Sequence, residues 1–129
     1  MRRAKFKLVL TGLLWASALF AGQAYSRPEA SSQSQATVSR AELPRQGLET
    51  YERIFQGGPF PHDKDGSVFG NRERHLPSNT RGYYREYTVK TPSARNRGAR
   101  RIICGGAATQ PDACYYTADH YASFRRIVP

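Results

Sequence analysis

One segment of this chain has the hydrophobic spacing of an α-helix, and everything after it has the spacing of β-strands. Residues 42–58 form the helical segment, and Pro44 suits its first turn. Gly57 and Gly58 follow the last apolar position, where glycine commonly ends a helix. The apolar residues that lie three and four positions apart on one helical face are Leu48, Tyr51, Ile54 and Phe55. This is the only convincing helix in the sequence.

The remainder of the chain is typical of short strands joined by turns rich in Pro, Gly and Asp. The clearest strand is "GYYREYTV", residues 82–89, which is rich in Tyr, Thr and Val. The other expected strands lie within residues 67–73, 100–105, 114–121 and 124–128. One helix followed by about five strands predicts an α+β fold, in which the N-terminal helix packs on an antiparallel sheet of about five strands.

The first 26 residues have the layout of a secretory signal peptide. A basic start, "MRRAKFK", precedes the apolar run "LVLTGLLWASALFAG", and small residues follow it. A membrane anchor is the alternative, but the apolar run is shorter than the about 20 residues that span a bilayer. We therefore expect cleavage after Ala24 or Ser26, export to the extracellular or periplasmic space, and no membrane association afterwards.

The next segment, residues 27–41, is polar and rich in small residues, without hydrophobic periodicity. It is typical of a flexible lead-in. The folded domain is expected over residues 42–129, a length that supports one modest hydrophobic core.

The charge of the chain indicates a polyanionic partner. It contains 20 Lys and Arg residues against 10 Asp and Glu residues. Removal of residues 1–26 takes away four basic residues and leaves 16, of which 14 are arginine, with a net charge of +6. Because the planar guanidinium suits phosphate and also stacks on bases, this composition favours a nucleic-acid partner.

Two cysteines, Cys104 and Cys114, favour a disulfide, because the export signal places the protein in an oxidising compartment. The alternative is half of a metal site, but no cluster of His and Cys in the sequence completes one.

The most basic stretch, residues 81–101, contains seven basic residues and a single acid, Glu86. Alternation along the strand places Glu86 on one face together with Tyr84 and Thr88. If this strand pairs with the next one, Glu86 faces Arg97 or Arg101. From this segment alone, the simplest interpretation is a cross-strand ion pair.

The three histidines, His62, His75 and His120, all lie in expected loops or turns. Each one alone is typical of a solvated surface residue, so none of them assigns a function by itself.

Three segments taken together resemble the microbial guanyl-specific ribonuclease family, which includes barnase, and especially the small secreted enzymes of filamentous soil bacteria. The resemblance spans about residues 42–129, and its anchors are "GPFPHDKDGSVFGNRE", "GYYREYTVKTPSARNRGARRIICG" and "YYTADHYASF", in this order.

The resemblance implies roles for five residues. Glu86 matches the family's general base and His120 its general acid, while Arg97 and Arg101 match the arginines that bind the phosphate. Tyr121 matches a tyrosine that touches phosphate. The implied reaction cleaves single-stranded RNA 3′ of guanosine by transesterification to a 2′,3′-cyclic phosphate, then hydrolyses it to a 3′-phosphate, without metal or other cofactor.

The resemblance also assigns guanine recognition. Glu73 matches the acid that accepts hydrogen bonds from guanine, with Phe69, Asn71 and Arg72 around the base. The alternative is that Glu73 pairs with a neighbouring arginine at the surface. The chain departs from the family pattern at Gly70, where the family often has a polar residue, and in its Cys104–Cys114 pair, which we expect to pin the loop before His120.

Two other functions compete with a secreted monomeric ribonuclease. A non-catalytic basic RNA-binding module needs neither Glu86 nor His120. A cationic antimicrobial protein needs a basic amphipathic helix, whereas the helical segment here has more acidic than basic residues. The family resemblance further implies an acidic, barstar-like protein inhibitor as a partner, which a basic site favours electrostatically.

Overall fold

The computed structural model describes Gly12 and residues 35–129. Apart from Gly12, the predicted signal peptide lies outside the described residues. Within the part that is described, no helix is long and apolar enough to cross a membrane.

The predicted helix is present as α1 (Arg45–Gln56), and it follows a 3₁₀ turn, η1 (Arg40–Glu42). Pro44 occupies the position before the first helical residue. Gly57 ends the helix with a φ of 82°, in the left-handed region where a side chain is strained. The apolar face is narrower than the spacing suggested, because Ile54 is buried whereas Phe55 is 43 % exposed.

The sheet contains the five predicted strands and one more, in the order β1-β6-β5-β4-β3-β2. The strands are β1 (Thr37–Ser39), β2 (Ser67–Val68), β3 (Tyr84–Thr88), β4 (Arg101–Gly106), β5 (Pro111–Thr117) and β6 (Arg125–Val128). Neighbouring strands are antiparallel except β1 and β6, which are parallel, so the sheet is mixed.

Strand β1 corrects both the strand count and the expected extent of the flexible lead-in. It lies within residues 27–41, and Val38 pairs with Ile127 at the far end of the chain. Both residues are buried in the core. Three residues are too few to show a periodic pattern, and their partner strand is distant in sequence, so local spacing gave no signal. The ordered structure thus begins before Glu42.

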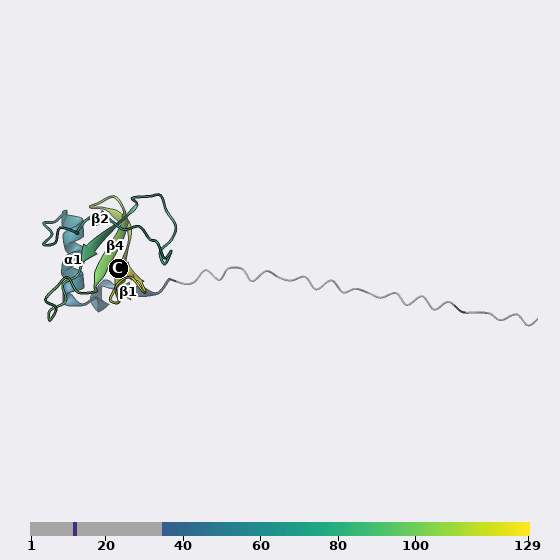
Figure 1. Cartoon of the computed structure of the whole chain (residues 1–129), viewed down its shortest axis with the longest axis horizontal. Coiled ribbons are helices and arrows are strands. Elements are labelled where there is room, and N and C mark those ends of the chain that lie inside the picture. The colour runs from purple at the N-terminus through teal and green to yellow at the C-terminus, as the bar shows by residue number, and fades with distance from the viewer. Residues whose placement is uncertain (1–11, 13–34) are drawn as a thin grey trace, which may run out of the picture.

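The two faces of the sheet pack against different parts of the chain. One face packs on α1 through a core that includes Ile54, Tyr87, Val89, Ile102 and Tyr116. The other face has a second cluster, which contains Leu76, Tyr84, Ile103, Tyr115 and Phe124 and lies under the long loops. Helix α1 lies along one side of the sheet, and the long loop between β2 and β3 extends on the other side (Figure 1). The second face is therefore the one that loops can turn into a binding site.

The cysteines form the predicted disulfide, Cys104–Cys114, with an S–S distance of 2.06 Å. The two residues are direct partners on β4 and β5. They belong to the core cluster on the α1 face. The bond therefore cross-links two central strands within the core, and it acts on the strand that leads to His120 instead of on the loop itself.

Candidate active site

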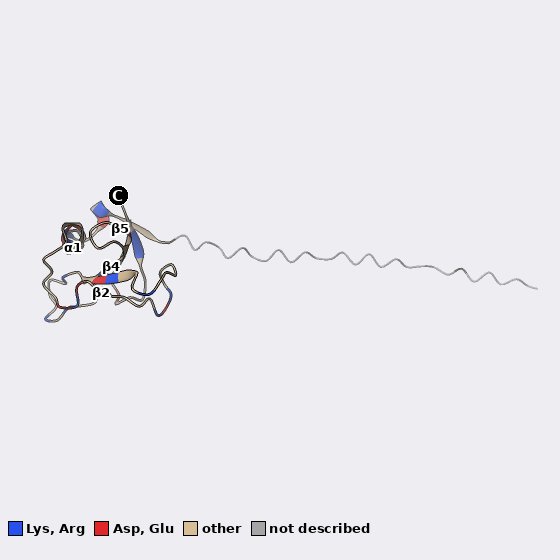
Figure 2. Cartoon of the chain, turned by 90° about the horizontal axis from the view of Figure 1, so that it is seen from above, with Lys and Arg blue, Asp and Glu red and all other residues tan. Residues whose placement is uncertain are grey.

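The central strands place the predicted base and the predicted phosphate ligands on one face. Glu86 pairs with Ile103, and Thr88 pairs with Arg101, across the β3–β4 ladder. Partners in a ladder project to the same side of a sheet, so Glu86 and Arg101 share the face opposite α1. Seen from above in Figure 2, basic residues are found on the sheet and on the loops around it.

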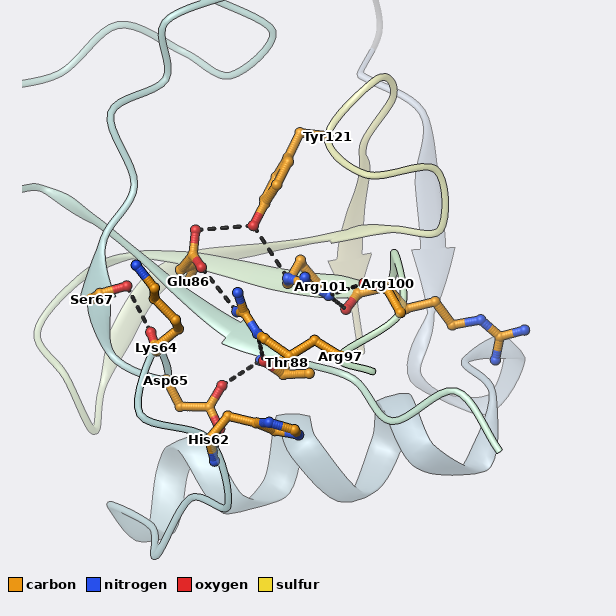
Figure 3. A network of polar contacts seen from close by, with 11 residues as sticks. His62, Lys64, Asp65, Ser67, Glu86, Thr88, Arg97, Arg100, Arg101 and Tyr121 are labelled. Carbon is orange, nitrogen blue, oxygen red and sulfur yellow. Dashed lines mark hydrogen bonds and ion pairs between the residues drawn. The ribbon is translucent and has the colours of Figure 1, made fainter. Parts of the chain in front are cut away.

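Glu86 is the centre of a network of charged hydrogen bonds (Figure 3). Nη2 of Arg97 donates to Oε1 of Glu86 at 3.0 Å, and the Tyr121 hydroxyl donates to Oε2 at 3.0 Å. Nε of Arg101 in turn donates to the Tyr121 hydroxyl at 3.2 Å. Only 13 % of the Glu86 side chain is exposed. The sequence predicted that Arg97 or Arg101 faces Glu86: Arg97 does so directly, and Arg101 does so through Tyr121.

The two arginines are fixed by contacts of their own. Nε of Arg97 donates to the Thr88 hydroxyl at 3.0 Å. Arg101 is only 3 % exposed, and its Nη1 donates to the carbonyls of Gly98 and Arg100. Within residues 35–129, Arg101 forms no ion pair with a carboxylate, so its charge is available to an anion at this face.

Tyr121 links the carboxylate to the buried arginine. Burial raises the pKa of Tyr121, and the Glu86 carboxylate raises it further. The hydroxyl therefore keeps its proton and acts as a neutral donor beside Glu86.

His120 lies next to this network on a turn between β5 and β6. Its ring is exposed, and the centre of the ring lies 4.7 Å from that of Tyr121. Both residues have positive φ, 53° and 69°, which is uncommon for non-glycine residues and is concentrated at functional sites. The backbone N–H of His120 donates to the carbonyl of Ala99 at 3.1 Å, which ties the turn to the loop before Arg101.

A pocket of about 250 Å³ opens beside Glu86. Glu73 and Glu86 both line it, together with Phe69 and Tyr121, whose rings are stacked with centres 5.2 Å apart. The predicted base-recognition acid and the predicted general base therefore face one cavity.

The loop that closes this pocket is held by Asn71. Its side chain accepts a hydrogen bond from the N–H of Leu76 at 3.1 Å and donates to the carbonyl of Leu76 at 2.9 Å. The Asn71 amide is therefore occupied, and a contact to a base would come from the backbone. In the described chain, the N–H groups of Gly70, Asn71 and Arg72 have no hydrogen-bond acceptor, as a backbone site for a base oxygen requires.

Glu73 and Arg72 are exposed at the mouth of the pocket. Over residues 35–129, Glu73 has no ion pair with Arg72 or Arg74, so the alternative of a surface salt bridge is not realised. A side chain at Gly70 would meet Cγ of Arg72 at an ordinary 3.6 Å, so the glycine is not required by space.

Comparisons with known proteins establish the family of this chain. The model of a family described as ribonuclease matches residues 26–128. The chain belongs to this ribonuclease family. It is 56 % identical over 90 residues to guanyl-specific ribonuclease Sa3 of Kitasatospora aureofaciens. That match covers 70 % of this chain and 62 % of the relative, so this ribonuclease matches less than two thirds of the length of Sa3.

Other relatives are matched over most of their length. The ribonuclease is 55 % identical over 91 residues to guanyl-specific ribonuclease Sa of K. aureofaciens, which covers 70 % of this chain and 92 % of Sa. A solved structure of ribonuclease Sa2 complexes with mononucleotides has a TM-score of 0.69 at 44 % identity, and covers 74 % of this chain and 95 % of that one.

The described part of this ribonuclease contains no group of three or more His, Cys, Asp or Glu residues arranged to hold a metal ion.

Sequence reasoning missed two carboxylates that position the site. Oδ1 of Asp65 accepts the N–H of Thr88 at 2.7 Å, and Oδ2 accepts the N–H of His62 at 3.1 Å. Asp65 thus anchors the loop after α1 to β3 beside Arg97 (Figure 3). His62 takes part through its backbone.

Asp119 is the second missed carboxylate, and it holds the turn that presents His120. Oδ1 accepts hydrogen bonds from the Thr117 hydroxyl and from the N–H of Ser123, both at 2.9 Å. The Ser123 hydroxyl donates to Oδ2. The spacing Thr-x-Asp followed by Ser four residues later was the available signal, because such side chains commonly bond to nearby backbone groups in turns.

We expect Asp119→Asn to lower stability near neutral pH, and this difference to vanish in acid. Hydrogen bonds from Ser123 lower the pKa of Asp119 to about 2. Because the unfolded value is about 3.9, the carboxylate adds stability that is complete above about pH 4 and is lost as the pH falls towards 2. Urea unfolding of both proteins between pH 2.5 and 6 measures the gap.

The matched variant is Ser123→Ala, which removes the largest cause of the lowered pKa. Its stability gap relative to Asp119→Asn should be smaller than the wild-type gap near neutral pH, and its closure should be complete at a higher pH. A gap that stays constant with pH would contradict the assignment.

Proposed function

We propose that this ribonuclease is a secreted, guanyl-specific endoribonuclease that cleaves single-stranded RNA on the 3′ side of guanosine. The observation that carries the proposal is the shared pocket: Glu73 and Glu86 line one cavity, and Glu86 is joined to Arg97 and Tyr121 by hydrogen bonds of 3.0 Å. A guanine held at Glu73 brings its ribose towards a carboxylate and its 3′-phosphate towards two arginines.

In the first step Glu86 removes the proton from the ribose 2′-OH. The 2′-oxygen attacks phosphorus, the bond from phosphorus to the 5′-oxygen breaks, and His120 gives a proton to that leaving oxygen. The products are a 2′,3′-cyclic phosphate and a free 5′-hydroxyl. In the second step the roles are exchanged. His120 takes a proton from a water molecule whose oxygen attacks phosphorus, the bond from phosphorus to the 2′-oxygen breaks, and Glu86 gives a proton to that oxygen, which leaves a 3′-phosphate.

The arginines stabilise the charge that builds on the phosphoryl oxygens. Arg101 is buried and pre-oriented by two backbone carbonyls, so it does not need to reorganise when the transition state forms. Arg97 donates a hydrogen bond to Glu86, the proposed general base, and places a second positive charge at the same face of the sheet. DNA lacks the 2′-OH and is expected to bind without being cleaved.

Guanine selection follows from hydrogen-bond complementarity. Guanine presents two adjacent donors, N1–H and the N2 amine, and a carboxylate such as Glu73 accepts both side by side. The free N–H groups of residues 70–72 suit its O6 acceptor, and the stacked aromatic pair of Phe69 and Tyr121 offers an apolar wall.

The nucleotides solved with relatives fit this reaction. Structures of ribonuclease Sa2 contain guanosine-2′-cyclophosphate and 3′-GMP, at 44 % and 45 % identity to this chain. These compounds correspond in type to the cyclic intermediate and the final product of the proposed mechanism.

The proposal includes the biological setting. The protein is exported by its first 26 residues and acts outside the cytoplasm as a monomer. An acidic, barstar-like protein is its inhibitor, because the arginine-rich site attracts acidic surfaces. N-terminal sequencing of secreted protein that began at Met1 would overturn the removal of the signal peptide.

One experiment decides between the enzyme and a non-catalytic RNA-binding module. Defined RNA oligomers are incubated with the protein, with and without EDTA, and the 3′ ends of the products are mapped. The enzyme gives ends at guanosine with cyclic or 3′-phosphates in both conditions. Intact RNA that is nevertheless bound would support the binding module.

We expect Arg101→Lys to lower kcat by about tenfold, less than the about 10²–10³-fold expected for complete removal of a donor to the transition state. Lysine keeps the charge but loses the planar fork, which holds two carbonyls and Tyr121 at once. Binding of 3′-GMP should weaken less than kcat falls, because charge builds in the transition state.

The matched control is Arg100→Lys, whose side chain points away from Glu86 (Figure 3) and should leave both quantities near the wild-type values. Equal losses in kcat and in 3′-GMP binding by Arg101→Lys would mean that Arg101 only attracts the substrate.

A further inference from the structure

We call the pocket lined by Glu73 and Glu86 the guanine pocket. A second hollow adjoins it and is lined by three arginines. We call it the arginine groove and define it by Arg72, Arg74 and Arg81, with Asn79 and Thr80 between them. Its volume is about 570 Å³, and its lining includes no acidic residue. The hollow between α1 and the loop before β4 differs, because Glu49 lines it together with Arg53 and Arg97.

The three guanidinium groups are unoccupied within the described residues. None of them forms an ion pair or a hydrogen bond with any residue from 35 to 129, and all three side chains belong to exposed residues. Three like charges around one hollow repel each other, so their arrangement favours an anionic ligand. Phosphate in particular suits the fork of arginine.

Arg74 has an unusual backbone for its residue type. Its φ is 56°, in the left-handed region that favours glycine and asparagine. Its N–H donates to the carbonyl of Asn71, so it belongs to the tight turn that closes the guanine loop. Strained backbone positions of this kind cluster at functional sites.

The position of the groove along β3 gives the direction of an RNA strand. The groove includes Tyr84 at the start of β3, Glu86 follows in the middle, and Thr88 at the end contacts Arg97. The guanine pocket lies between the groove and Glu86, because it shares residues 68–72 with the groove and also includes Glu86. In the proposed function the phosphate 3′ of guanosine binds at Glu86, Arg97 and Arg101, which places the groove on the other side of the guanine base.

We propose that the arginine groove binds the phosphates of the RNA on the 5′ side of the cleaved guanosine. This inference rests on the proposed function, and it assigns to this enzyme a subsite that recognises the sugar–phosphate chain without reading its bases. The loop that forms the groove extends from the side of the sheet away from α1 (Figure 1), where a strand leaving the guanine pocket can follow it.

The test compares substrates with and without phosphates on the 5′ side. The substrates are GpN, NpGpN and NpNpGpN, and the extension control is GpNpN, which is longer only on the 3′ side. The proteins are the wild type, the double variant Arg74→Gln/Arg81→Gln, and a matched control, Arg125→Gln/Arg126→Gln, which removes two exposed arginines from β6. The measured quantities are kcat and KM at several salt concentrations.

We expect two nucleotides on the 5′ side to raise kcat/KM of the wild type by about 4- to 25-fold, since two exposed ion pairs contribute about two- to fivefold each. Arg74→Gln/Arg81→Gln should lose most of this gain through KM, and its salt slope for NpNpGpN should become shallower by about 1. Its activity on GpN and GpNpN should stay within about twofold of the wild type. The control variant should keep the full gain.

Two results separate the inference from the function on which it rests. If the wild type does not cleave GpN, the proposed function fails. If it cleaves GpN but gains nothing from 5′ nucleotides, or if the variant loses activity equally on all four substrates, the groove is not a 5′ subsite. Anisotropy with an oligomer that contains 2′-deoxyguanosine, which binds without being cleaved, should show the same loss of affinity in the double variant.

Discussion

Replacement of Glu86 by Gln is expected to lower kcat for a GpN dinucleotide by about 10²–10⁴-fold, the usual contribution of a positioned base. The amide keeps the shape of the side chain and can still accept hydrogen bonds from Arg97 and Tyr121, but it cannot take the 2′-OH proton. His120→Gln should cause a loss of the same size, because it removes the proton donor to the 5′-oxygen. The double variant should lose little more than either single variant, because residues that act as a unit are not additive.

The structure makes a sharp test possible, because Glu86 does form the ion pair that its sequence context suggested. With Arg97 it forms a partly exposed bridge of 3.0 Å. Such a bridge contributes about 0.2–1 kcal/mol to the free energy of unfolding. If the bridge were its whole role, Glu86→Gln would lower stability by this small amount and leave the rate unchanged. A catalytic base gives the opposite result, a large loss of rate with little loss of stability.

Arg97→Gln is the control that completes this comparison. It removes the same ion pair but leaves the carboxylate of Glu86 bonded to Tyr121. Its unfolding free energy should match that of Glu86→Gln within about 1 kcal/mol. The comparison concerns stability alone, because Arg97 is itself a proposed phosphate ligand and its removal should also lower the rate. A Glu86→Gln/His120→Gln variant that cleaved near the wild-type rate would end the assignment of both residues.

The pH–rate profile gives an independent check on the two roles. The profile of kcat/KM should be bell-shaped, because the first step requires Glu86 ionised and His120 protonated. The acidic limb should disappear in Glu86→Gln and the basic limb in His120→Gln, when the residual rates are measured across the pH range. Loss of the wrong limb in either variant would exchange or remove the assigned roles.

The fold was predictable where its signals are local. Apolar spacing and a terminal glycine predict the helix, and residues rich in Tyr and Thr predict β3. Both elements are found where expected. Strand β1 was missed, because it consists of three residues whose stability comes from pairing with β6 nearly ninety positions away in sequence, as in Val38 with Ile127. A contact of that kind leaves no periodic pattern in the sequence around it.

The resemblance named residues that the structure brings together, but it did not give the contacts between them. The resemblance named Glu86, Arg101 and Tyr121, but only the structure shows that a tyrosine hydroxyl joins the other two. Asp65 and Asp119 were missed for a physical reason. They accept hydrogen bonds from backbone N–H groups at the end of β3 and in loops, and a sequence shows which side chains are present without showing which backbone groups lack a partner.

The other large effect concerns the choice of base, for which Glu73 is responsible in the proposed mechanism. The wild type should cleave GpN far faster than ApN, CpN or UpN, because a site that hydrogen-bonds its substrate rejects an analogue that lacks the donors. Adenine has no N1–H and has its amine at a different position, so Glu73 would remain without partners. Glu73→Ala should narrow the preference chiefly by slowing GpN.

The positions of Glu73 and Glu86 in the pocket decide what this experiment can distinguish. Glu73 lies at the mouth of the pocket and is exposed, and Glu86 lines the same pocket from the sheet. Removal of Glu73 therefore leaves the network of Arg97 and Tyr121 around Glu86 intact, and the slow cleavage of ApN, CpN and UpN should persist. Glu73→Gln is the matched variant: its amide oxygen still accepts one bond from guanine, so its preference should fall between those of the wild type and Glu73→Ala.

The measurement is kcat/KM for the four dinucleotides with the three proteins. Equal slowing of all four by Glu73→Ala would mean that the carboxylate supports the pocket or the catalytic step without reading the base. Full retention of the guanine preference would place recognition on the backbone instead. The N–H groups of residues 70–72 have no acceptor within the described chain and face no competition for O6. They offer donors only, however, and so cannot satisfy N1–H and the N2 amine, which is why we expect the preference to depend on Glu73.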